Sequence, residues 1–237
     1  MKIAVIGQGR MGSLIDQEAK KRGHTTVMGD CLVPDAIENA KDSIDLYIDF
    51  SHPDNLDFIL NTAAGTNAAL VLGTTGYSDE QLARIEEEAK TRPVFFSSNY
   101  SLGIAALKEL AKAAAAILNG WDMEIVELHH NQKADAPSGT ALSLLETIDP
   151  NNEYEHVFGR SGKPGARKKE IGIHALRGGT AAGDHEILFL GDQETVRISH
   201  SAQNRQIFVN GALDAAEFME GKPASLYSMT DLVGAKR

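Results

Sequence analysis

Two adjacent histidines and a lysine lie close together near the middle of the chain. His129 and His130 end a stretch in which polar and apolar residues alternate, and Lys133 follows shortly after them. A histidine changes its charge near neutral pH and can deliver a proton, while an ammonium group can hold negative charge or help a protonation. Adjacent strand residues point in different directions, so the two imidazoles are poorly placed to chelate one metal ion. The cluster therefore indicates proton chemistry, with two polar histidines of a surface loop as the alternative.

A helix is expected to begin directly after this cluster. Ser138, Gly139 and Thr140 precede residues 141–148, whose apolar positions have helical spacing. Backbone N–H groups at the start of a helix, together with the Thr140 hydroxyl, can receive a carboxylate, and the positive charge of Lys133 would favour the same anion. With a strand predicted over residues 123–128, the cluster lies on a strand-to-helix connection that can hold chemistry rigidly.

A second candidate site lies at the start of the chain. Residues 2–6 predict a short apolar strand, and residues 13–22 have helical spacing. In the turn between them the first glycine allows a tight bend, the second lets the backbone approach a pyrophosphate, and the third lets the helix pack on the strand. The candidate cofactor residues in this turn are Gly7, Gln8, Gly9, Arg10, Met11 and Gly12. A glycine-rich turn that binds no ligand is the alternative.

The ends of later strands supply further cofactor candidates. Asp30 follows the β-prone residues 25–28, about twenty residues beyond the turn, where an acid can accept a hydrogen bond from an adenosine ribose hydroxyl. A solvated loop carboxylate is the alternative for Asp30. Strands predicted over 69–72 and 93–96 end at the same edge of the sheet, where open α/β sheets bind ligands. The residues delivered there are Gly73, Thr74, Thr75, Ser97, Ser98, Asn99 and Tyr100.

The pattern of helices and strands around these sites predicts two kinds of domain. Strands and helices alternate through the first hundred residues, which predicts a Rossmann-like, doubly wound parallel sheet of the α/β class. A long alanine-rich helix over 105–118 follows, and strand-like segments then dominate, which predicts a smaller α+β domain with a mixed open sheet. The helical segment 207–219 is expected to return to the first domain. We therefore assign residues 1–99 and 206–237 to a dinucleotide-binding domain, and residues 100–205 to a substrate-binding and oligomerisation domain.

One segment of the second domain lacks any periodicity. Residues 151–169 are rich in glycine, serine and basic residues, and predict a long loop near the site. From Arg160 to Arg177 the chain also carries Lys163, Arg167, Lys168 and Lys169, against the single acid Glu170. This local positive charge suits a dianionic substrate, with a solvated basic loop as the alternative.

The composition excludes several classes of function. The 237 residues are 42% hydrophobic and 24% charged, and the net charge of −10 argues against a nucleic-acid partner. No apolar run approaches the ~20 residues that a membrane span needs. The single Cys31 cannot form an internal disulfide or a thiolate metal site, so we expect no metal. We expect a cytoplasmic protein that acts on a small molecule.

The residues around the histidines resemble a known family. Residues 127–141 are similar to the motif of the 4-hydroxy-tetrahydrodipicolinate reductases, also called dihydrodipicolinate reductases, of the diaminopimelate route to lysine. Further matches occur at residues 7–12, 48–51, 73–76, 98–103, 177–185 and 227–232, so the resemblance covers nearly the whole chain. It implies an NAD(P)H-dependent reduction of 4-hydroxy-tetrahydrodipicolinate, a small dicarboxylate, with loss of water. It also implies a homotetramer, which we expect to assemble through the second domain.

The resemblance implies roles for individual residues. His129 is the proton donor and acceptor, Lys133 is a second proton donor, and the substrate is bound by His130, Gly139 and Thr140. A non-catalytic NAD(H)-sensing regulatory protein is the alternative function, but it leaves this cluster unexplained.

One departure from the family pattern concerns the choice of cofactor. Members that favour the 2′-phosphate tend to carry a basic residue beside the acid, whereas Cys31 follows Asp30 here. We therefore expect NADH or NADPH as the cofactor, with NADH used at least as well. A thioester-forming dehydrogenase would need a nucleophilic cysteine at the crevice, and Cys31 lies near the predicted ribose position instead.

Overall fold

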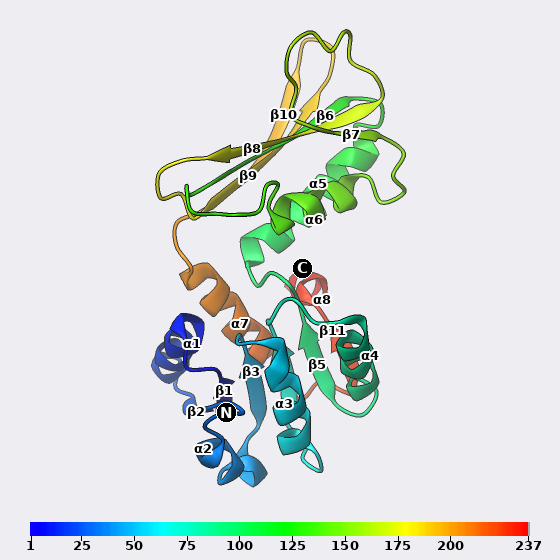
Figure 1. Ribbon diagram of the computed structural model, residues 1–237. Coiled ribbons are helices and arrows are strands. Elements are labelled where there is room, and N and C mark those ends of the chain that lie inside the picture. Colours follow the sequence, from blue (N-terminus) through cyan, green and yellow to red (C-terminus); the bar gives the residue numbers. More distant parts are fainter. Residues whose placement is uncertain (237) are drawn as a thin grey trace. The chain divides into compact units, whose positions relative to one another are not determined.

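Contacts along the chain divide it into two units (Figure 1). The computed structural model describes residues 1–236. The first unit comprises Met1–Leu102 and the residues from Gln206 onward, and the second comprises Gly103–Arg205. The division after Leu102 falls inside a helix, whereas the sequence predicts it after residue 99.

The first unit contains a six-stranded parallel sheet. Its strands are β1 (Lys2–Ile6), β2 (Thr25–Gly29), β3 (Leu46–Asp49), β4 (Ala69–Leu72), β5 (Pro93–Phe96) and β11 (Ser225–Tyr227). In space they run in the order β11, β5, β4, β3, β1, β2, and every pairing is parallel. The chain moves outward from β1 to β2 and then reverses through β3, β4 and β5. The switch point therefore lies between β1 and β3, at whose carboxyl ends such sheets bind ligands.

Helices connect these strands and cover the sheet. They are α1 (Arg10–Lys21), α2 (Asp35–Glu38), η1 (Lys41–Ser43), η2 (Pro53–Asn55), α3 (Leu56–Ala63), α4 (Asp79–Glu88), α7 (Gln206–Phe218) and α8 (Met229–Ala235). Every residue of β3 and β4 is buried, because strands of a parallel sheet are covered on both faces. Ser78 and Gln81 form a capping box at the start of α4.

The second unit contains a five-stranded mixed sheet and a helical layer. Its elements are α5 (Leu102–Ile117), β6 (Asp122–His129), α6 (Gly139–Ile148), β7 (Glu155–Phe158), β8 (Glu170–Arg177), β9 (Gly183–Leu190) and β10 (Thr195–Ala202). The strand order is β10, β9, β6, β8, β7, with antiparallel pairs on one side of β6 and parallel pairs on the other. Together with the parallel sheet of the first unit, this confirms the predicted fold class.

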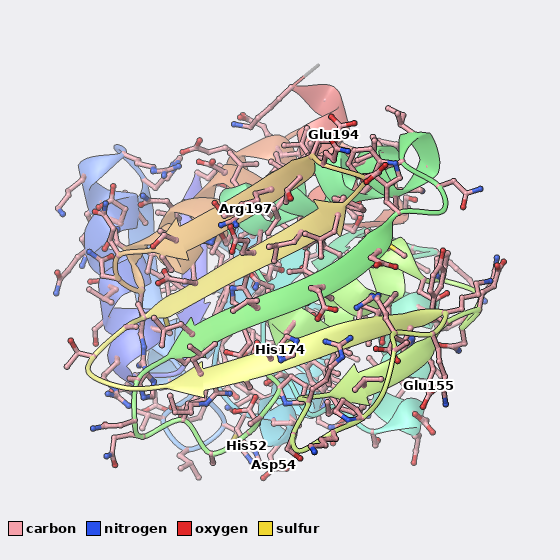
Figure 2. The ribbon with its side chains drawn as sticks, turned by 90° about the horizontal axis from the view of Figure 1, so that it is seen from above. His52, Asp54, Glu155, His174, Glu194 and Arg197 are labelled. Atoms are coloured by element: carbon pink, nitrogen blue, oxygen red, sulfur yellow. The ribbon has the colours of Figure 1, made fainter. Side chains whose placement is uncertain are left out.

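The two faces of the mixed sheet differ. Burial alternates along β6 and β9, and the buried residues pack with α5 and α6 in one hydrophobic core. Figure 2 looks onto the uncovered face, where His174 of β8 and Arg197 of β10 are labelled. Alternation with a period of two places Glu127 and His129 on the covered face, and Glu124 on the uncovered one.

The predicted loop over residues 151–169 is wrong in one part, because it contains β7. This short edge strand pairs in parallel with β8 over Glu155–Phe158. A four-residue strand with only half-buried and exposed positions leaves no alternation for a sequence pattern to detect. β11 and α8 form in the C-terminal segment, for which the sequence analysis names no element.

The basic residues of this segment are bound to acids of the sheet. Arg160 contacts Glu124 at 2.9 Å and Glu170 at 2.7 Å, and Arg167 also binds Glu124. Burial by itself raises the pKa of Glu124, but Arg160, His174 and Arg167 together lower it to about 2. The positive charges of Arg160 and Arg167 are thus neutralised by acids of β6. Counting the charges within residues 160–177 alone does not include these acids. The side chains of Arg160 and Arg167 therefore lie on the uncovered face of the sheet, beside Glu124.

Candidate active site

The candidate site of the second unit is built around Glu127 and His129 at the end of β6. The Glu127 side chain is completely buried, and His129 is 7% exposed. Because the two residues are two positions apart on a strand, their side chains lie on the same face. His129 Nδ1 donates to Glu127 Oε2, and the short motif thus contains a paired carboxylate and imidazole.

Three further donors bind the Glu127 carboxylate. Arg177 Nη1 donates to Oε2 at 2.9 Å and Nη2 donates to Oε1 at 2.7 Å, which is the bidentate geometry of a strong pair. The backbone N–H of Ser138 donates to Oε1 at 3.1 Å. Burial raises the pKa of Glu127, but Arg177, His129 and the Ser138 N–H together hold that pKa below its ordinary value. Glu127 is therefore a buried anion with a full set of donors.

The other side of the His129 ring faces Gly183 and His185. A Cβ atom at position 183 would lie 2.8 Å from His129 Nε2, so the glycine leaves space beside that nitrogen. The rings of His129 and His185 meet edge to face, with centroids 5.1 Å apart. Burial, followed by the neighbouring His129, lowers the pKa of His185 to about 4. His185 is therefore neutral at physiological pH and supplies packing beside His129 without charge.

Ser138 joins this cluster to the start of α6. Its side chain is 2% exposed, and its Oγ shares a hydrogen bond of 3.1 Å with His185 Nε2. The same Oγ accepts from the Ala141 N–H at 3.2 Å, as expected of an N-cap residue. The Ser138 hydroxyl therefore contacts His185 and caps the helix.

The start of α6 and Lys133 converge on one carboxylate, that of Asp135. Lys133 Nζ lies 2.8 Å from Asp135 Oδ1. The Lys133 ammonium, with help from the backbone N–H of Gly139, lowers the pKa of Asp135. Gly139 is exposed and Thr140 is half-buried at the first turn of the helix. These groups therefore have the positions of an anion site, and a carboxylate of the chain itself engages Lys133 and Gly139 there.

His130 has a different environment from His129. Its backbone N–H donates to the Ala181 carbonyl at 2.9 Å, and its Nδ1 accepts from the Gln132 N–H at 3.2 Å. The side chain is half-buried, and the Glu127 carboxylate binds its neighbour His129 instead. The two histidines therefore have separate surroundings, as the strand geometry predicts.

In the first unit, two glycines of the turn between β1 and α1 are required by close contacts. Gly7 has a φ of +89°, and a Cβ there would meet Ser51 Cβ at 2.7 Å. A Cβ on Gly12 would lie 2.0 Å from the Gly7 carbonyl oxygen. At Gly9, by contrast, a Cβ would meet nothing within 4 Å. Gly9 is the N-cap of α1 and gives it no side-chain cap, and the space beside its Cα is open.

This difference gives a matched pair of variants. Gly12→Ala is expected to destabilise the protein by about 1–3 kcal/mol through overpacking, because the backbone of the turn must move. Gly9→Ala has an allowed backbone conformation, with φ −76° and ψ −170°, and should leave the melting temperature almost unchanged. Gly9→Ala should still weaken cofactor binding if a pyrophosphate occupies the open space. Thermal unfolding and cofactor titration of both variants check this, and equal melting temperatures would contradict the packing argument.

A buried carboxylate connects the loops around this turn. Asp49, at the end of β3, is completely buried, and this burial raises its pKa. Its carboxylate accepts from Tyr77 Oη at 2.9 Å and from the Ser51 hydroxyl. The backbone N–H of Ser51 donates to Thr74 Oγ1 at 2.8 Å, and Asn55 Nδ2 donates to Ser51 Oγ at 2.9 Å. Asp49 therefore fixes the loops that follow β3 and β4.

The candidate residues after β4 and β5 divide into buried and accessible ones. The Thr74 hydroxyl belongs to the Asp49 network and is 4% exposed, whereas Thr75 is exposed. A Cβ on Gly73 would lie 2.4 Å from the Phe50 ring. The Tyr100 side chain is 1% exposed and donates to the Leu72 carbonyl at 2.9 Å, so it packs in the core. Any contact of Thr74 or Tyr100 with a cofactor must therefore use the main chain.

The remaining residues of this loop are more open. Ser97 Oγ donates to the Asn99 carbonyl at 2.8 Å, and Asn99 Oδ1 accepts from the Ser101 N–H at 2.9 Å. Ser98 is exposed. These bonds keep the loop after β5 in a defined conformation at the carboxyl edge of the sheet.

Asp30 directly follows β2, as the sequence predicts. Its Oδ1 accepts from the N–H groups of Leu32 at 2.9 Å and Val33 at 3.1 Å. The Cys31 N–H donates to Asn55 Oδ1 at 2.9 Å, so the Asp49 network also reaches this loop. The carboxylate of Asp30 is therefore held in place at the end of the strand, next to an exposed Cys31.

Three consecutive cations at the end of α1, which precede Asp30 in the sequence, form ion pairs with other acids. Lys20 Nζ lies 2.8 Å from Asp16, Lys21 Nζ lies 3.2 Å from Glu18, and Arg22 Nη1 lies 2.8 Å from Asp214. Arg22 also donates to the Asn210 carbonyl, which fixes it against α7. None of these three side chains is directed to Asp30 by a contact of the described residues.

Glu127 and His185 are absent from the sequence-based candidates, and Arg177 is named among them only as one of a run of basic residues. The signal for Glu127 and His185 is the period of two on β6 and β9, which places Glu127 beside His129 and puts His185 on the buried face. Within residues 1–236, no group of three His, Cys, Asp or Glu residues is arranged to hold a metal ion. The helices in that same range are too short or too polar to cross a membrane.

Comparison with known proteins gives consistent results for both units. Residues 1–100 match the family model described as dihydrodipicolinate reductase, N-terminus, and residues 103–233 match the one described as dihydrodipicolinate reductase, C-terminus. The 4-hydroxy-tetrahydrodipicolinate reductase of Caldanaerobacter subterraneus subsp. tengcongensis is 43% identical, over 95% of this chain and 94% of its own length. That of Clostridium novyi is 43% identical, over 96% of each chain.

A solved structure shares the fold. Dipicolinate-bound dihydrodipicolinate reductase from Paenisporosarcina sp. TG-14 superposes with a TM-score of 0.75 and 24% identity, over 96% of this chain and 97% of that one. The alternative of a non-catalytic NAD(H)-sensing regulatory protein finds no support among these relatives.

Proposed function

Because this chain belongs to the dihydrodipicolinate reductase family, we propose that it reduces 4-hydroxy-tetrahydrodipicolinate to tetrahydrodipicolinate in the diaminopimelate route to lysine. The first unit binds the dinucleotide and the second binds the substrate. The observation that carries the proposal is the cluster in the second unit, where His129, Lys133 and the start of α6 combine a proton donor with a site for an anion.

The reaction consumes one hydride and one proton and releases one water. A reduced nicotinamide cofactor supplies the hydride when it is bound. Loss of water from the hydroxylated cyclic imine leaves a conjugated imine, and the arriving electron pair moves negative charge toward its far end. A proton donor must neutralise that charge, and we assign this role to His129, with Lys133 as a second donor. His129 Nε2 is the available nitrogen, because Nδ1 is bound to Glu127.

Substrate binding is assigned to the start of α6. The backbone N–H groups of Gly139 and Thr140, the Thr140 hydroxyl and the Lys133 ammonium would receive one carboxylate of the substrate. The contacts of Asp135 with Lys133 and Gly139 support this assignment, since they demonstrate that both groups can act on one carboxylate. His130 directly follows β6 and is a further candidate for a substrate contact.

The first unit fits a dinucleotide at the turn between β1 and α1. The open space at Gly9 and the uncapped first turn of α1 suit a pyrophosphate, with Gln8, Arg10 and Met11 beside it. Asp30 would accept from the adenosine ribose, and the loops after β4 and β5 would contact the nicotinamide half through Thr75 and Ser98. We propose NADH as a cofactor used at least as well as NADPH, because Asp30 repels a 2′-phosphate and the nearby cations are paired elsewhere.

Steady-state oxidation of NADH and NADPH with enzymatically generated 4-hydroxy-tetrahydrodipicolinate tests both proposals. We expect turnover with both cofactors, and kcat/KM with NADH equal to or above that with NADPH. Absence of turnover with either cofactor would refute the reductase assignment. A large advantage for NADPH would leave the reaction intact and refute the reasoning on Asp30 and Cys31.

We also propose that copies of the chain associate through the uncovered face of the mixed sheet, as the homotetramer implied by the sequence. Half-buried apolar residues of this face, including Val126, Leu128, Leu188 and Leu190, share it with the acids Glu124, Asp184 and Glu186. Such a mixed surface can pack against a copy of itself. Measurement of the mass in solution tests the assembly.

The compartment we propose is the cytoplasm, where reduced nicotinamide cofactors are regenerated.

A further inference from the structure

The buried Glu127 carboxylate accepts an unusually large number of hydrogen bonds. Four donor nitrogens from three residues reach it, namely His129 Nδ1, both terminal nitrogens of Arg177 and the Ser138 N–H. An unpaired charge in this place would be very costly, so the donors must stay together for the fold to be stable. One of these partners, His129, is the proposed proton donor, and the others come from the end of β8 and the start of α6.

From this geometry we infer that Glu127 is a positioning residue for the reduction. It binds His129 through Nδ1, keeps the proton of the neutral imidazole on that nitrogen, and leaves Nε2 to exchange a proton with the substrate. This inference rests on the proposed function, because it assigns a support to the proton donor named there.

The position of Nε2 supports this assignment. A ring held through Nδ1 by a buried carboxylate directs its other nitrogen away from that carboxylate, and the space beside Nε2 is kept open by Gly183. Neutral His185 packs against the edge of the ring and adds no competing charge. Glu127 and His185 therefore hold the imidazole in one orientation and one tautomer, with Nε2 toward the open side.

The same carboxylate is connected to Lys133 through Arg177. Besides its two bonds to Glu127, Arg177 Nη2 donates to the Asp135 carbonyl at 2.6 Å, and Nη1 donates to the Leu176 carbonyl at 2.6 Å. Asp135 in turn pairs with Lys133 through its side chain. The Glu127–Arg177 pair thereby holds the loop that carries Lys133 at a fixed place relative to His129.

A single substitution can reverse the tautomer. In Glu127→Gln the amide nitrogen must replace either Oε1, which faces Arg177 Nη2 and the Ser138 N–H, or Oε2, which faces Arg177 Nη1 and His129 Nδ1. Arginine and a backbone amide cannot give up their protons, whereas a neutral imidazole can move its proton to the other nitrogen. The amide nitrogen should therefore face His129 and donate to Nδ1, which moves the imidazole proton to Nε2.

The test is the nitrogen-15 spectrum of the histidine side chains in the full-length protein without substrate, at a pH where the His129 ring is neutral. The His129 signals are identified by their loss in His129→Gln. In the wild-type protein we expect the proton on Nδ1, and in Glu127→Gln we expect it on Nε2. The matched control is Glu124→Gln, the same change on the same strand, in an acid that binds Arg160 and His174 on the opposite face. It should leave the His129 signals unchanged.

Kinetics give the second measurement. Glu127→Gln should lower kcat by about 10–10²-fold, a part of what a general acid contributes, and change KM for the cofactor by less than about twofold. A wild-type proton on Nε2 would overturn the inference, even if the variant does not fold. An unchanged tautomer or an unchanged kcat in a folded Glu127→Gln would do the same. Because the spectrum needs no turnover, a failure of the proposed reaction would be recognised separately.

Discussion

Replacement of His129 by glutamine is expected to lower kcat by about 10²–10⁴-fold, the usual contribution of a general acid. The fold should survive, because a glutamine amide can donate to Glu127 and fills much of the volume of the ring. Cofactor affinity should also survive, since His129 lies in the second unit and the glycine turn lies in the first. Steady-state kinetics, thermal unfolding and cofactor titration of the purified variant provide the three measurements.

A matched control for this prediction is His156→Gln. His156 is also bound to a carboxylate, with its Nε2 2.9 Å from Asp149 Oδ2, but it lies on the edge strand β7. It should leave kcat within about twofold of the wild-type value. If kcat of His129→Gln also remained at the wild-type level, His129 would be a structural residue and the proton donor would have to be sought elsewhere.

Much of the first unit could be predicted because its signals are local. A parallel sheet buries whole strands, so β1, β3 and β4 appear as short apolar runs separated by glycine turns and amphipathic helices. The glycine turn is recognisable for the same reason, since Gly12 is required by a contact with Gly7 inside the turn and Gly7 has a positive φ. The short elements α2, η1 and β11 carry too few residues for a period to show.

The site of the second unit could be predicted only in part. His129, Lys133 and the start of α6 are contiguous in sequence, and their residue types indicate their chemistry directly. Arg177 lies fifty positions from Glu127, and only the pairing of β6 with β8 brings the two together. Likewise, the residues from 160 onward have an excess of positive charge in the sequence. Their partner Glu124 lies on another strand, so the sequence does not reveal the pairing. Contacts between strands that are distant in sequence cannot be predicted from composition and residue spacing.

The second large effect is expected at the start of α6. Thr140→Val keeps the shape of the side chain but removes its hydroxyl, and loss of a hydrogen bond to a charged carboxylate should weaken substrate binding by roughly 1.5–3 kcal/mol. This corresponds to an increase of about 10–150-fold in KM for the substrate, at 1.4 kcal/mol per tenfold. KM for the cofactor should change far less. Thr147→Val is the matched control, since Thr147 lies on the same helix and its hydroxyl donates to the Ser143 carbonyl instead.

Combining Thr140→Val with Lys133→Met determines whether both residues bind one carboxylate. Two residues that share a partner give non-additive losses, whereas independent sites add within about 0.5 kcal/mol. The structure favours a shared partner, because Lys133 and the Gly139 N–H already act together on the Asp135 carboxylate. We therefore expect the double variant to lose less binding free energy than the sum of the single variants. Simple additivity would separate Lys133 from the substrate carboxylate and leave it only the role of a proton donor.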